Sequence, residues 1–157
     1  MSEFIRSVAQ LYSGQLARYR NRPFLRAAMA GCALVTMANG SVSLRERMRV
    51  DRIMETLDAL KVFDPHEGVA LFNEFVEALR DDPAEGRRRA LEVITREVTE
   101  EPEKAGLIAR ICLAVSERDG AIAPEQRQEV ADLCRCIGVA PSFCPGNGEG
   151  NTASSLR

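Results

Sequence analysis

The residues best suited to chemistry in this chain are carboxylates beside two Asx-Gly pairs. Around Asp119-Gly120 three of them, Glu117, Asp119 and Glu125, fall within nine residues. Carboxylate oxygens are hard ligands that suit Ca²⁺, Mg²⁺ or Mn²⁺. Around the other pair only Asn39 and Glu46 offer oxygen ligands. The sequence therefore predicts a candidate divalent-cation site at the second pair and a poorer one at the first.

Both pairs also have an ordinary structural explanation. An Asx-Gly pair between two helices tolerates left-handed backbone, and Ser43-x-x-Glu46 has the form of a capping box. An EF-hand comparison places Gly40 or Gly120 at the sixth loop position, where a glycine permits the sharp turn. In both loops the first ligand position is then a valine. We therefore expect no high-affinity calcium binding of the EF-hand kind from either loop alone.

No constellation of residues typical of catalysis is present in the sequence. The chain has no Gly-rich phosphate loop, no HExxH motif, and no Ser or Cys beside a His in a recognisable motif. Its single histidine, His66, follows Asp64-Pro65 at a predicted helix start, where a solvated side chain is expected. We therefore predict no catalytic residue and no enzymatic activity.

The five cysteines are an odd number, which indicates thiols rather than a disulfide framework. Cys32, Cys112 and Cys134 fall on apolar helical faces, where a free cysteine behaves as a small hydrophobic residue. The pair Cys134-x-Cys136 is not spaced like a zinc knuckle. A redox role would require an exposed, reactive Cys136 or Cys144.

The elements that must position these residues occur twice. The segment Cys32–Glu46 recurs in pattern and spacing as Cys112–Gln126, 80 residues later. Behind each glycine the apolar residues follow the spacing i, i+3, i+4, i+7, which is one face of a helix. These residues are Val50, Ile53, Met54 and Leu57 in the first copy and Val130, Leu133, Cys134 and Ile137 in the second. The pattern predicts two related halves, each a helix, a tight turn and a second helix.

The chain as a whole is predicted to be all-α, with about seven helices. Two Asp-Pro-x-Glu segments, at 64–67 and 82–85, combine an N-cap, a first-turn proline and a capping-box glutamate. The predicted helices cover residues 3–19, 23–38, 43–60, 65–80, 83–98, 102–118 and 124–137. A length of 157 residues fits one domain, placed at 1–141. Residues 142–157, rich in Gly, Ser and Asn, are predicted to be a disordered tail.

Charge and hydropathy limit the possible partners. A net charge of −2 disfavours nucleic acid, and no run of 18 apolar residues indicates a membrane span. The N-terminus lacks the layout of a secretory signal, so we expect a cytoplasmic protein. Acidic residues gather over residues 97–103. This acidic cluster is either a helix junction or a surface that attracts cations.

The order and separation of these features resemble the TerB family of tellurite-resistance proteins. The resemblance rests on the doubled helix–Asx-Gly–helix pattern, on Lys61-Val-Phe63-Asp64 with its Phe-rich helix, and on the ending Cys136-Ile-Gly138-Val-Ala-Pro141. It covers about residues 24–141. It implies an all-helical domain of two related halves and a bacterial stress-response role linked to tellurite and other toxic agents.

The resemblance also implies partners and site residues. TerB-like proteins are thought to work beside a membrane-embedded partner and calcium-binding members of the same operon. Acidic residues near their turns are proposed to bind metal, and these correspond here to Asn39, Glu46, Asp119 and Glu125. The chain departs from the family at Asn39, where Asp is usual, and at Gln126, where the family tends to be acidic. Both departures remove negative charge, which weakens the expectation of metal binding.

Three functions therefore compete. The first is a non-enzymatic, acidic interaction scaffold in tellurite resistance, which docks on other resistance proteins at the cytoplasmic membrane face. The second is a divalent-cation-binding regulator, in which Glu117, Asp119 and Glu125 hold the ion. The third, direct reduction of tellurite by thiols, requires exposed and reactive cysteines.

Overall fold

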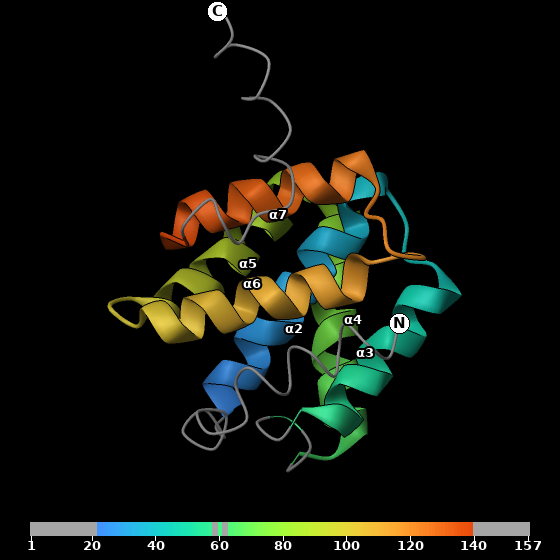
Figure 1. Cartoon of the computed structure of the whole chain (residues 1–157), viewed down its shortest axis with the longest axis horizontal. Coiled ribbons are helices and arrows are strands. Elements are labelled where there is room, and N and C mark those ends of the chain that lie inside the picture. The colour runs from blue at the N-terminus through green and yellow to red at the C-terminus, as the bar shows by residue number, and fades with distance from the viewer. Residues whose placement is uncertain (1–21, 58–59, 61–62, 140–157) are drawn as a thin grey trace, which may run out of the picture.

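The computed structural model describes residues 22–57, 60 and 63–139, and these residues form an all-helical bundle (Figure 1). The prediction of an all-α fold is confirmed. The described residues contain no β-strand, and the β-bridge among them is an isolated one between Arg118 and Ala121. The elements are α2 (Arg22–Thr36), the 3₁₀ helix η2 (Met37–Asn39), α3 (Leu44–Thr56), α4 (Pro65–Asp81), α5 (Pro83–Val98), α6 (Pro102–Ser116) and α7 (Pro124–Ile137).

Six of the seven predicted helices correspond to these elements, with small differences at their ends. The helix predicted over 23–38 stops at Thr36 and tightens into η2. The helix predicted over 43–60 ends at Thr56, because Leu57 is already extended. The predicted helix at 3–19 and the predicted tail at 142–157 lie outside the described residues. No described helix combines the length and the apolar character needed to cross a bilayer.

Side-chain caps set the starts of three helices. Asp64 and Asp82 accept hydrogen bonds from the backbone N–H groups of His66 and Glu85, and a proline follows each as the first helical residue. Ser43 and Glu46 form the predicted capping box at the start of α3. The α6 and α7 helices differ, because their N-cap residues, Glu101 and Ala123, provide no side-chain hydrogen bond. This difference matters for the site described below.

The hydrophobic core lies around α2 and α6, the first helix of each predicted half. Almost every residue of both helices from Phe24 and from Ala105 onward is buried. Figure 1 shows α2 passing behind α6 and beside α4, and α2 also packs against α5. The Cys112 side chain of α6 packs against Gly31 of α2, where an added Cβ would lie 2.8 Å from the sulfur. The turns that follow α2 and α6 are therefore held at one end of the core.

Candidate functional site

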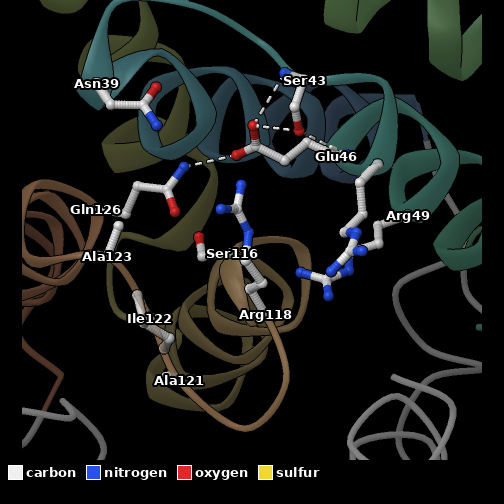
Figure 2. Close-up of a pocket in the computed structure, with 11 residues that line it drawn as sticks. Asn39, Ser43, Glu46, Arg49, Ser116, Arg118, Ala121, Ile122, Ala123 and Gln126 are labelled. Carbon is white, nitrogen blue, oxygen red and sulfur yellow. Dashed lines mark hydrogen bonds between the residues drawn. The ribbon is translucent and has the colours of Figure 1, made fainter.

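A pocket of about 270 Å³ lies where both predicted turn regions and the starts of α3 and α7 meet (Figure 2). Its walls come from segments 80 residues apart in the sequence. The lining residues are Asn39, Ser43, Arg45, Glu46, Arg49, Ser116, Arg118, Ala121, Ile122, Ala123 and Gln126. The structure thus brings the two turn regions to one site, which the sequence pattern alone did not predict.

The second turn is a tight hairpin. Arg118 and Ala121 exchange backbone hydrogen bonds of 2.6 and 2.9 Å. Asp119 and Gly120 between them have φ of 52° and 81°, as in a type I′ turn, whose two central residues both need positive φ. The carboxylate of Glu117 accepts a hydrogen bond of 3.1 Å from the Gly120 N–H. Glu117 therefore braces the backbone of its own turn.

The first turn has a different backbone. Here Asn39 ends the 3₁₀ helix, and Gly40 follows with φ of 95°. With its amide turned so that the nitrogen faces two carbonyl oxygens, Asn39 donates to Thr36 at 3.1 Å and to Ser41 at 2.8 Å. The side chain thus holds the turn together. Both turns place a glycine at positive φ. The first turn follows a 3₁₀ helix, whereas the second is a tight hairpin.

Glu46 and Gln126, which occupy equivalent positions in the two copies, meet across the pocket. The Gln126 amide donates a hydrogen bond of 2.6 Å to one Glu46 carboxylate oxygen. The other oxygen accepts from the backbone N–H and the hydroxyl of Ser43, at 3.0 and 2.8 Å. Both side chains are buried. Glu46 therefore links the start of α3 to the start of α7.

The five residues predicted as metal ligands do not converge on one point. Glu46 and Asn39 are engaged in the contacts just described, and Glu117 binds its own turn. Asp119 is exposed and lies 3.7 Å from the guanidinium of Arg45, while Glu125 is exposed in the first turn of α7. Across the ranges 22–57, 60 and 63–139, no group of three His, Cys, Asp or Glu side chains is placed to hold a metal ion. Metal binding at these residues stays a prediction from the sequence.

Sequence reasoning missed the three arginines that line the pocket, Arg45, Arg49 and Arg118. Arg49 is the unusual one, because it is only 3% exposed. Among the described residues its one hydrogen bond is a long one of 3.5 Å to the carbonyl of Val115, and its Nε has no partner there. Burial lowers the pKa of the Arg49 guanidinium, and the nearby Glu117 carboxylate opposes that change. The sequence did contain a signal for this burial. Arg49 and Glu46 precede Ile53 at helical spacing, so they lie on the same buried face of α3.

The buried thiols are poorly suited to redox chemistry. Cys32 and Cys112 are fully enclosed between α2 and α6. Burial raises the pKa of the Cys32 thiol to about 12 and that of Cys112 well above its usual value. Because the thiolate is the reactive form, these two groups are weak nucleophiles at neutral pH. Cys136 is exposed, and Cys144 lies outside the described residues.

Comparison with known proteins gives two matches. Residues 25–144 match the family model described as Tellurite resistance protein TerB. A protein named Tellurium resistance protein TerB, from Alcaligenes sp, is 30% identical over 97 residues, which make up 62% of this chain and 79% of that protein. No solved structure matches the chain.

Proposed function

The chain belongs to the TerB family of tellurite resistance proteins, and we propose that it serves resistance as a non-enzymatic interaction protein. In this proposal it is cytoplasmic and binds other proteins of the resistance system, one of them embedded in the membrane. Family membership supports the link to tellurite resistance. Beyond family membership, we propose that the protein has partner proteins and a docking surface for them.

The observation that carries the proposal is an exposed apolar pair on α3. Leu44 and Met48 are 75% and 60% exposed, and they are the large hydrophobic side chains with high exposure in the described part of the chain. A spacing of four residues places them on the same face of a helix, one turn apart. Exposed apolar side chains that adjoin each other on a helix provide anchors for a partner groove. We assign the docking surface to this pair.

The acidic cluster at residues 97–103 is a weaker docking surface than the apolar pair. Lys104 lies 2.9 Å from carboxylate oxygens of both Glu97 and Glu101. Glu97 and Glu101 are therefore paired at the start of α6. This leaves less uncompensated negative charge than the sequence indicates.

The proposal is tested by binding measurements with each neighbouring resistance protein, the membrane-embedded one in detergent. The double variant Leu44→Lys, Met48→Lys should lose at least tenfold in affinity while keeping its helical circular dichroism. The control is Arg96→Glu, an exposed position on α5 whose ion pair with Glu92 lies on the surface. Unchanged binding by the double variant would show that the docking surface lies elsewhere. Absence of association with every partner tested would contradict the proposal.

A divalent-cation-binding regulator is the alternative, and one observation favours it. One carboxylate oxygen of Glu117, Oε2, is buried without a hydrogen-bond partner in the part of the chain that the structure describes, and an oxygen in that state has a free position for a cation. On this reading millimolar Ca²⁺ or Mn²⁺ raises the melting temperature, because a ligand that binds only the folded state stabilises it. Asp119→Asn is a suitable variant, since Asn tolerates the positive φ of this position while removing the charge. An equal thermal shift in the variant and the parent would eliminate Asp119 as a ligand.

A further inference from the structure

The pocket between the two turn regions carries an excess of positive charge. Three guanidinium groups line it, from Arg45, Arg49 and Arg118, against a single carboxylate, that of Glu46. Both oxygens of that carboxylate already accept hydrogen bonds, from Ser43 and Gln126. The sequence predicted that this end of the molecule binds a divalent cation, whereas the residues that line the pocket favour binding of an anion.

Arg49 is a buried cation without an ion-pair partner in the described part of the chain. It is 3% exposed, no described carboxylate lies within 4 Å of it, and its Nε is unpartnered. A buried charge is costly unless a counter-charge and hydrogen bonds compensate it. Glu46 and Glu117 attract it only from a greater distance. An anion in the pocket would provide the missing compensation.

Arg118 offers a second cationic group to the same space. Figure 2 shows its guanidinium projecting toward the region between Glu46, Gln126 and Arg49. Within the ranges described above, its side chain makes neither a hydrogen bond nor an ion pair. The rim is completed by Arg45, whose 3.7 Å contact with the exposed Asp119 is the kind of surface pair that contributes little.

The start of α7 adds uncapped backbone donors. Ala123, the N-cap, has no side chain that could accept from the first N–H groups, and both Ala123 and Gln126 line the pocket. The first amides of a helix and its dipole favour an anion at this end. At the equivalent place in the first copy, the Ser43 side chain accepts a hydrogen bond from a first-turn N–H group of α3. The start of α7 has no such side-chain cap.

We propose that this pocket binds a small oxyanion, held by Arg49 and Arg118 and by the uncapped start of α7. The volume of about 270 Å³ leaves room for such an anion together with water molecules. Guanidinium groups and helix N-termini both recognise the tetrahedral or pyramidal oxygens of phosphate, sulfate and tellurite. This proposal is independent of the docking surface on α3 and stands if no partner protein binds there.

The experiment is calorimetric titration of the full chain with tellurite, inorganic phosphate and sulfate, at constant ionic strength set by chloride. We expect saturable binding of at least one oxyanion. Arg118→Gln should weaken it at least tenfold without loss of folding, because this side chain is exposed and packs in no core. The matched control is Arg135→Gln, an exposed arginine near the other end of α7, which should bind as the parent does.

The outcomes distinguish the sources of the oxyanion. Tighter binding of tellurite than of phosphate would identify the toxic oxyanion itself as the ligand, and the reverse order would identify a phosphate-bearing ligand. Both results support the site. Absence of saturable binding of all three anions would overturn the proposal, and so would undiminished binding by Arg118→Gln. Arg49→Lys, which keeps the charge but loses the planar fork, should weaken binding less than Arg49→Gln.

Discussion

Gln126 has a role that its place in the sequence did not reveal. The resemblance noted in the sequence implied an acidic residue at this position, so the glutamine weakened the expectation of metal binding. In the structure the Gln126 amide donates to Glu46 at 2.6 Å in a buried contact. A second carboxylate at this point would repel the first. The glutamine therefore stabilises the junction between the two turn regions.

We predict that Gln126→Glu lowers the free energy of unfolding by about 1–3 kcal/mol, because it replaces a buried hydrogen bond with like-charge repulsion. Chemical denaturation at neutral pH measures this change. The control is Gln128→Glu on the same helix, where the side chain is exposed and bonds to Asp132. That variant should lose at most about 0.5 kcal/mol, as expected for an i, i+4 pair of like charges. Equal losses in the two variants would contradict the assigned role of Gln126.

The buried thiols predict how stability depends on pH. Burial raises the pKa of Cys32 from 9.0 to about 12, so the folded state keeps a proton that the unfolded state releases between these values. Because the folded state then binds more protons, stability is fully present below about pH 9 and falls as the pH rises above it.

The slope of this loss is at most about 1.4 kcal/mol per pH unit for one thiol. Urea unfolding between pH 8 and 10 should show a shallower decline in Cys32→Ala than in the parent, whatever the absolute stability of the variant. Cys136→Ala, at an exposed position, is the control and should keep the parent slope. Identical slopes in Cys32→Ala and the parent would show that burial of Cys32 does not cause the decline.

Among the elements, the close packing of α4 against α5 depends on one glycine. A Cβ added at Gly86 would lie 2.7 Å from the backbone carbonyl oxygen of Ala78. Backbone cannot move aside as a flexible side chain can. Glycine is therefore required here by the approach of two helices, although it weakens a helix intrinsically.

We predict that Gly86→Ala destabilises the protein by about 1–3 kcal/mol, the usual range for overpacking, even though alanine is the better helix former. Thermal unfolding measures the effect. Gly68→Ala is the comparison, because the three atoms nearest to its Cβ would all belong to the flexible Met54 side chain, so this variant should cost less. A gain in stability from Gly86→Ala would show that the two helices separate readily.

At the scale of the whole molecule, paired positions of the two predicted halves have matching roles. Thr36 and Ser116 each donate a side-chain hydrogen bond of 2.8 Å to a cysteine carbonyl four residues earlier, Cys32 or Cys112. Gly40 and Gly120 both have positive φ. These correspondences agree with the predicted duplication, which itself stays a prediction.

The central place of α2 and α6 predicts the pattern of hydrogen exchange. Both helices are almost completely buried, whereas α3, α5 and α7 expose one face. The slowest amides should therefore lie in α2 and α6 and exchange only through global unfolding. Native-state exchange followed by NMR measures this pattern. Faster exchange in the middle of α2 than in α3 or α7 would contradict it.

Local chemistry explains why much of the fold could be predicted. The apolar stripe Val50, Ile53, Met54 and Leu57 is buried as predicted, because helical periodicity depends only on neighbours along the chain. The same holds for the Asp-Pro helix starts and for the capping box. Helix ends were less predictable, and α3 stops at Thr56 within a pattern that continued to residue 60.

The candidate site depended on contacts between distant segments. The sequence alone determined that Glu46 caps a helix and that glycines close both turns, since those are interactions within a few residues. Only the tertiary structure decided that Glu46 faces Gln126 and that Arg49 is enclosed beside Val115, 66 residues away. Packing of α2 against α6 places these groups together, and no local pattern contains that information. Of the carboxylates that dominated the sequence, Glu117 therefore bonds its own turn and Asp119 and Glu125 are exposed, whereas Glu46 lines the pocket together with three arginines.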